Sequence, residues 1–221
     1  MSSGALKTIL VEVVSDIVCP YCWIGKRHLE AAINETKDKF NVHVRWYPFQ
    51  LRSETPIEGT LKSPDTPTNP RVGQNMRMMG QKVGIDFTGK TDRTPNTIHA
   101  HNLMHLAFGK GGSVLQNKVQ EKLFQAYFTD GVFLDAQTVI DIGVAAGMDR
   151  DGTQRYVTDP AMCAKTKSDA HTNAMRGVHG VPTFMVNGEV VFSGAQGAQS
   201  FIRVFESAPP VKEDQWAWEQ Q

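Results

Sequence analysis

The chain has 221 residues, and its 23 Lys and Arg residues are balanced by 23 Asp and Glu residues. This length is enough for one hydrophobic core, or for a domain with a large insertion. A net charge of zero gives no reason to expect a nucleic acid or an anionic membrane as a partner. Three cysteines are too few for a disulfide scaffold.

The N-terminal segment predicts where the protein resides. Residues 1–7 lack the apolar core of a signal peptide, and the apolar run that follows is interrupted by Glu12. It is too short and too polar for a transmembrane helix. We therefore expect a cytoplasmic protein, in which paired cysteines are usually catalytic, redox-sensing or metal-binding.

A Cys-Pro-Tyr-Cys motif follows the first predicted strand, residues 8–14, which is rich in β-branched side chains. Cys19 is expected at the start of a helix, with Pro20 and Tyr21 in the first turn and Cys22 one turn inside. Proline is tolerated there because its missing N–H is not needed. Unpaired N–H groups and the helix dipole would stabilise a thiolate on Cys19.

The residues after the motif support a helix followed by a strand. Apolar side chains recur at helical spacing from Trp23 to Ile33, and Lys26, Arg27 and Glu30 are expected on the opposite, polar side. Residues 42–46 alternate as a second strand does. A CxxC motif beside a βαβ pattern is typical of a redox site.

A second motif lies near the C-terminus, in residues 177–192. Val181-Pro182 stands at the mouth of a predicted strand, Asn187-Gly188 predicts a type I′ hairpin, and residues 189–192 form the returning strand. Pro182 is a candidate for a cis peptide bond. A cis bond would expose the backbone of Val181 to a substrate beside the dithiol.

These motifs together resemble the DsbA-like oxidoreductases of the thioredoxin superfamily. The resemblance is carried by Ser15-Asp16 before the CPYC motif, by Val181-Pro182-Thr183-Phe184, and by Ser193-Gly194-Ala195-Gln196 before a last helix. Pro95-Asn96-Thr97 with Ala100-His101 resembles the non-secreted branch called polyketide-biosynthesis dithiol-disulfide isomerases. The resemblance covers most of residues 7–207 and implies an α/β, thioredoxin-like fold with a large helical insertion.

The intervening residues fit such an insertion. Residues 52–70 contain four prolines and predict a loop. Helices are predicted at about 71–84, 96–109, 113–129, 136–146, 149–157 and 161–177, with a glycine turn between the second and the third. We expect a thioredoxin-like domain of residues 7–52 and 178–207, a helical insertion domain of residues 53–177, and a C-terminal tail of residues 208–221.

The predicted function is thiol-disulfide exchange. Cys19 would attack a substrate disulfide, or accept attack by a substrate thiol, and Cys22 would resolve the mixed disulfide. Val181 would pair its backbone with the substrate and Pro182 would shape the groove. The substrate is a thiol or disulfide, glutathione is a candidate co-substrate, and no separate cofactor is expected. The sequence predicts neither the direction of net flow nor the oligomeric state.

Two other functions remain open at this stage. The first is glutathione-dependent transfer or isomerisation, as in kappa-type transferases and chromene-carboxylate isomerases, although these relatives typically carry serine where this chain has Cys19. The second is a non-catalytic binding module that uses the groove beside Pro182.

A zinc site is the main alternative for the cysteine pair. Zinc needs two further ligands, and the sequence offers Cys163 and scattered histidines such as His171 and His179 instead of a second CxxC. We therefore predict a redox pair and no metal. Cys163 lies in a predicted helix and is expected to be a buried structural thiol. A third redox thiol is the alternative.

Other polar residues are weaker candidates. His99, His101 and His105 share a predicted helix but lack the glutamate of a metalloprotease helix, so we interpret them as a polar helix edge. The resemblance makes Asn96 and His101 candidates to line the cleft. Asp16 either relays protons to and from Cys22 or caps the turn between strand and helix.

Overall fold

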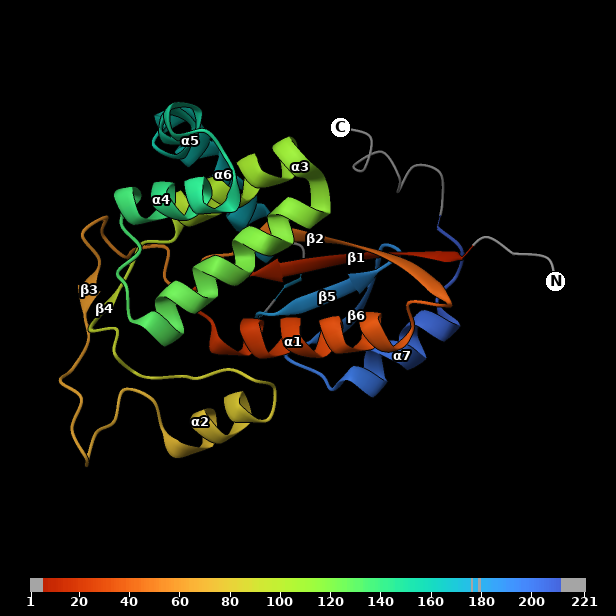
Figure 1. Cartoon of the computed structure of the whole chain (residues 1–221). Coiled ribbons are helices and arrows are strands. Elements are labelled where there is room, and N and C mark those ends of the chain that lie inside the picture. The colour runs from red at the N-terminus through yellow and green to blue at the C-terminus, as the bar shows by residue number, and fades with distance from the viewer. Residues whose placement is uncertain (1–5, 176, 179, 212–221) are drawn as a thin grey trace.

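The computed structural model describes residues 6–175, 177–178 and 180–211. Its main sheet has the order β2-β1-β5-β6 (Figure 1). The strands are β1 (Lys7–Ser15), β2 (Phe40–Pro48), β5 (Thr183–Val186) and β6 (Glu189–Ser193). The β1 and β2 strands are parallel, whereas β5 is antiparallel to both β1 and β6. The C-terminal strands β5 and β6 therefore lie beside the first strand, with β5 paired to β1.

The predicted hairpin between β5 and β6 is confirmed. Asn187 and Gly188 have φ angles of 49° and 84°, and positive φ at both central residues is what a type I′ turn requires. The Asn187 side chain also accepts a hydrogen bond from the backbone N–H of Leu10, at 2.8 Å. The turn is thus tied to the central strand β1.

Two helices lie together on one side of the sheet, below it in Figure 1. They are α1 (Pro20–Glu35) and α7 (Ala198–Ser207), and they contact each other. The aromatic ring of Phe201 from α7 meets that of Phe184 from β5 edge to face, with 4.9 Å between centroids. Because α7 also contacts α1, this packing links the helix that begins at the CPYC motif to the C-terminal strands.

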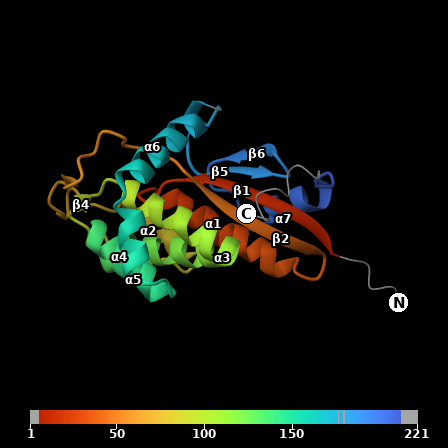
Figure 2. The same ribbon diagram turned by 90° about the horizontal axis from the view of Figure 1, so that it is seen from above.

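The α3 and α6 helices of the insertion contact β2 from the opposite side, whereas α2 lies below the sheet in Figure 1, on the side of α1. Seen from above, α6 runs from the end of the molecule that carries α4 and α5 toward the β5–β6 hairpin (Figure 2). The insertion consists of α2 (Gln74–Gln81), α3 (Ile98–Gln125), a π-helical turn (Ala126–Asp130), α4 (Ala136–Ala146), α5 (Arg150–Val157) and α6 (Pro160–Met175).

The predicted elements differ from the observed ones in three places. Two predicted helices, 96–109 and 113–129, run on as α3 across a kink at Gly111 and Gly112. The φ angle of Gly112 is 58°, which glycine adopts more readily than any other residue. The first insertion helix is shorter than predicted. The predicted loop of residues 52–70 contains a short strand, β3 (Thr60–Leu61), which pairs with β4 (Arg93–Thr94). Local pattern does not reveal this long-range contact.

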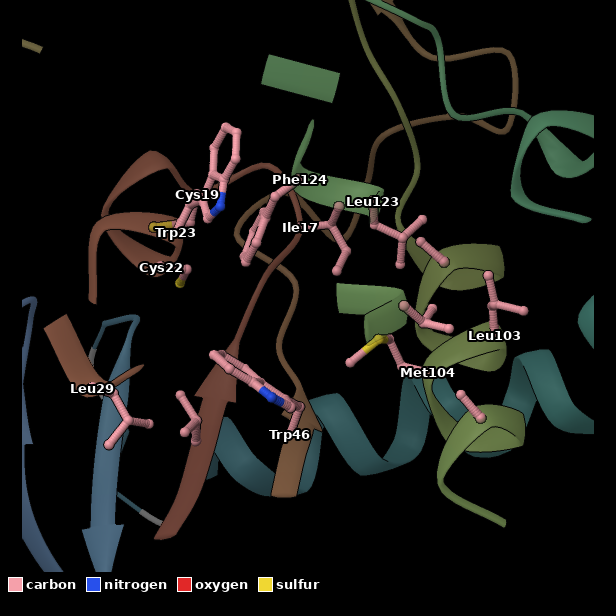
Figure 3. Packing of buried hydrophobic residues seen from close by; sticks show 14 of the residues in the cluster. Ile17, Cys19, Cys22, Trp23, Leu29, Trp46, Leu103, Met104, Leu123 and Phe124 are labelled. Atoms are coloured by element: carbon pink, nitrogen blue, oxygen red, sulfur yellow. The ribbon is translucent and has the colours of Figure 1, made fainter. Parts of the chain in front are cut away.

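One hydrophobic core joins the sheet, α1 and the insertion (Figure 3). Trp23 of α1 stacks on Phe124 of α3, with 5.9 Å between ring centroids, and meets Phe87 edge to face at 5.8 Å. Both phenylalanines are fully buried. The helix of the cysteine pair is therefore fixed from the insertion side as well as from the sheet. Among the described residues, no helix is long and apolar enough to cross a membrane.

Candidate active site

The cysteine pair lies at the N-terminus of α1. Cys19 is the N-cap residue, with extended backbone angles, and Pro20 is the first helical residue. Both thiols are free, Cys19 is 4% exposed and Cys22 is fully buried. Figure 3 shows both cysteines beside Trp23. Tyr21 is 44% exposed and lies at the surface. A reagent from solvent therefore meets the Cys19 end of the motif first.

The two thiols have opposite pKa shifts. A hydrogen bond from the Cys22 thiol is the main influence on Cys19 and, with backbone N–H groups of Tyr21 and Cys22, it lowers the pKa of Cys19 against the effects of burial and of Asp16. Burial raises the pKa of Cys22 well above its ordinary value, and the hydrogen bond with Cys19 raises it further. Thiolate character is therefore concentrated on Cys19.

The C-terminal motif lies against this thiol. The Sγ atom of Cys19 donates to the carbonyl oxygen of Val181 at 3.4 Å, and the Val181–Pro182 peptide bond is cis. Val181 is half-buried and Pro182 is buried. The structure thus brings together Cys19, Cys22, Val181 and Pro182, four residues that the sequence analysis assigned to one site.

Asp16 lies in the wall behind the pair and is 1% exposed. Its Oδ2 atom accepts a hydrogen bond from the backbone N–H of Leu51 at 2.8 Å. Its Oδ1 atom lies 3.5 Å from Nε2 of His101, and that nitrogen is 2.9 Å from the carbonyl oxygen of Phe49. The side chain of Asp16 thus holds the loop after β2 as well as lying near His101.

The other weaker candidates occupy separate places. The Asn96 side chain donates to Thr55 at 2.6 Å and accepts from the N–H of Ile98 at 3.0 Å, so it ties a loop to the start of α3. His105 is hydrogen-bonded to Tyr156. The Cys163 thiol accepts from Asn102 at 3.2 Å. Among the described residues, no contact links Cys163 to the CPYC pair.

Residues 6–175, 177–178 and 180–211 contain no group of three or more His, Cys, Asp or Glu side chains placed to hold a metal ion. His179, one of the ligands considered for zinc, lies outside the described residues, as do the tail residues Trp216 and Trp218.

A pocket opens beside the motif, where Val18 and Pro20 form part of its wall. Its volume is about 420 Å³, and three basic side chains line it: Arg52, Lys62 and Arg71. The ammonium group of Lys62 lies 4.8 Å from the centre of the Tyr127 ring. Burial, together with the nearby charges of Arg71 and Arg52, lowers the pKa of Lys62 to about 8. The proline-rich loop and the residues after it thus place positive charge beside the CPYC motif.

An ion cluster around the buried Lys26, which joins α1 to α3, was not predicted from the sequence. Lys26 was expected on the polar side of the helix, and this is wrong: the residue is 1% exposed. Its ammonium group lies 2.5 Å from Glu30 and 2.9 Å from Glu121 of α3. Glu121 also pairs with Arg27 and accepts from the indole N–H of Trp23 at 3.2 Å. In the local sequence, only the presence of Lys26, four residues after Cys22, could have indicated this cluster.

Several known proteins are similar to this chain. The chain is 29% identical over 205 residues to the uncharacterized protein YwbO of Bacillus subtilis, covering 88% of this chain and 94% of that protein. The crystal structure of a probable DsbA oxidoreductase from Streptomyces coelicolor is similar with a TM-score of 0.75 and 25% identity, over 92% of this chain and 93% of that one.

A third similar structure is that of the cytosolic disulfide reductase DsbM from Pseudomonas aeruginosa with glutathione. Its TM-score is 0.62 and its identity 15%, over 90% of this chain and 98% of that one, which supports the fold alone. The thioredoxin-like α/β fold with a large helical insertion is confirmed. Residues 10–204 match the family model described as the DSBA-like thioredoxin domain. The chain belongs to the family of DsbA-like thiol-disulfide oxidoreductases.

Proposed function

We propose that the chain catalyses thiol-disulfide exchange through the Cys19–Cys22 pair. The observation that carries this proposal is the asymmetry of the two thiols: Cys19 caps the helix with a lowered pKa, whereas Cys22 is fully buried with a raised pKa. A thiolate is the attacking species in such exchange. Cys19 therefore acts as the nucleophile and Cys22 as the resolving thiol.

In the reductive direction, the Cys19 thiolate attacks one sulfur of a substrate disulfide and releases the other half as a thiol. Cys22 then attacks Cys19, forms the intramolecular disulfide and releases the second half. The Val181 backbone, beside Cys19 Sγ, pairs with the substrate in this proposal. Pro182 shapes the adjoining wall. No separate cofactor takes part, because the electron pairs move between sulfur atoms.

The pocket beside Pro20 supports a small substrate that carries carboxylates. Arg52, Lys62 and Arg71 line it together with apolar side chains such as Met76, and a pocket of one charge sign concentrates ligands of the opposite sign. Glutathione, with two carboxylates and a thiol, has this chemistry. We therefore propose glutathione, or a similar acidic thiol, as the co-substrate. The predicted cytoplasmic location remains a prediction that cell fractionation tests.

The test is to trap the intermediate. Reduced Cys22→Ser protein is mixed with glutathione disulfide and analysed by intact-mass spectrometry; we expect one glutathione on Cys19. Cys19→Ser should remain unmodified, and Cys163→Ser, the matched control, should react as the native protein does. A native protein that transfers glutathione to an electrophile but forms no mixed disulfide would contradict the proposal and favour a transferase.

A further inference from the structure

A second cavity lies behind the cysteine pair, between β2, α3 and α6, with a volume of about 260 Å³. Ser15 forms part of its inner wall, whereas Lys165 and Thr172, both exposed, lie on its outer side. The cavity therefore extends from the end of β1 toward the surface of α6. It does not share its lining residues with the basic pocket beside Pro20.

Two buried polar atoms face this cavity without a hydrogen-bond partner that meets normal distances and angles. They are Oγ of Ser15 and Nε2 of Gln120, in residues that are 2% and 1% exposed. The neighbouring Gln116 differs, because its amide donates to the carbonyl oxygens of Trp46 and Met104 at 3.1 and 3.2 Å. Buried polar atoms are nearly always satisfied by protein or water. A polar cavity that exceeds about 15 Å³ can hold an ordered water molecule.

Ser15 links the inner end of the cavity to Cys22. The Ser15 hydroxyl lies close enough to Cys22 to lower the pKa of that thiol, against the larger effect of burial. Cys22 is fully buried, so its proton has no direct exit to solvent. The groups that face the pair are Cys19, the Ser15 hydroxyl and Asp16, with His101 behind Asp16.

We propose that water in this cavity, held by Ser15 and Gln120, carries the Cys22 proton to solvent when the mixed disulfide is resolved. The inference rests on the proposed function. In this step the Cys22 proton passes through the Ser15 hydroxyl to cavity water, and the sulfur electron pair forms the bond to Cys19. The bond between Cys19 and the substrate sulfur breaks, and the departing thiolate takes a proton from solvent. The cysteine pair is oxidised and the substrate disulfide is reduced.

The proposal separates the two chemical steps, because the attack by Cys19 does not use the cavity. Gln120→Leu preserves side-chain size and does not touch Cys22. Since positioned proton transfer contributes about 100-fold or more, its partial loss should slow resolution about tenfold while the attack by Cys19 keeps its native rate. Ser15→Ala should slow the same step. Gln125→Leu, on the exposed side of α3, is the matched control and should resolve normally.

The measurement is single-turnover reaction of the reduced full chain with glutathione disulfide, quenched with acid and analysed by mass spectrometry for accumulated mixed disulfide. Native resolution in Gln120→Leu would overturn the proposal, even if Ser15→Ala were slow, because the hydroxyl would then act directly. A high-resolution crystal structure of the native protein tests it without a variant: water on Ser15 Oγ and Gln120 Nε2 supports it, and a dry cavity overturns it. Absence of any mixed disulfide in Cys22→Ser would instead refute the proposed function, and this inference with it.

Discussion

Cys19 donates its thiol hydrogen to the carbonyl oxygen of Val181, which lies 162 positions further along the chain, with 3.4 Å between the sulfur and the oxygen. This contact joins the start of α1 to the loop that leads into β5. It places the Cys19 thiol beside the backbone of Val181, which is half-buried. A substrate that pairs with the Val181 backbone would thus present its sulfur to Cys19.

The first prediction concerns the hydrogen bond between the two cysteines. The Cys22 thiol is the main cause of the lowered pKa of Cys19. Cys22→Ala should therefore raise the pKa of Cys19, whereas Cys22→Ser, which retains a hydroxyl donor, should raise it less. The measurement is the rate of alkylation of Cys19 against pH, with Cys163 replaced by serine in both proteins. Equal pKa values in the two variants would show that the hydrogen bond has no such effect.

The second prediction concerns the buried ion cluster. Glu121→Gln removes the charge that faces Lys26 and Arg27 but keeps the shape of the side chain. Because Lys26, which is 1% exposed, keeps Glu30 as a partner, this loss should lower the free energy of unfolding by about 1.5 to 3 kcal/mol. Urea denaturation measures it.

The control for this cluster is Asp141→Asn, which breaks the pair with Arg150 at the surface. Because exposed pairs are screened by solvent, it should leave the denaturation midpoint unchanged. If both variants denature at the native midpoint, the cluster contributes no stability between α1 and α3.

The first strand and the helix after it could be predicted from the sequence because they depend on the local spacing of apolar side chains. The place of the CPYC motif at the start of that helix could be predicted because Pro20 fits the first helical turn. The burial of Lys26 could not be predicted in the same way. Its partner Glu121 is 95 positions away, and α1 alone presents a lysine that looks solvated. The same limit applies to Ser15 and Gln120, which share a cavity only after β1 and α3 have packed.

The third prediction concerns the basic pocket. The pKa of Lys62 is about 8, so this side chain is positively charged below that pH and neutral above it. Binding of S-methylglutathione, whose carboxylates stay ionised, should weaken as pH rises through about 8. Loss of the Lys62 charge, which is partly exposed, should weaken the binding free energy by about 1 kcal/mol, or the affinity by roughly fivefold. Isothermal titration calorimetry on either side of this pH measures the change.

Two variants decide whether Lys62 is responsible for the pH dependence. Lys62→Met should bind the ligand more weakly at neutral pH and lose the change near pH 8. Lys82→Met, an exposed lysine at the end of α2 that does not line the pocket, should behave as the native protein does. An unchanged pH profile in Lys62→Met would assign the titration to another group.

The last prediction concerns the close approach of α1 to the Pro182 wall. A Cβ atom on Gly25 would lie 3.0 Å from Phe184 and 3.2 Å from Pro182, and Phe184 is fully buried against Phe201. Alanine favours a helix by about 1 kcal/mol over glycine, but the overpacking should cost about 1 to 3 kcal/mol. We therefore expect Gly25→Ala to be destabilised on balance.

The same substitution at Gly109 of α3, where an added Cβ meets nothing within 4 Å, should instead stabilise the protein by about 0.5 to 1 kcal/mol. Thermal and urea denaturation compare the two variants. Because the displaced Pro182 borders Cys19, Gly25→Ala should also form its mixed disulfide with glutathione more slowly, while Gly109→Ala reacts at the native rate. If Gly25→Ala gained as much stability as Gly109→Ala, the wall beside Cys19 would be able to yield, and the close packing of α1 on Pro182 would not fix the geometry of the site.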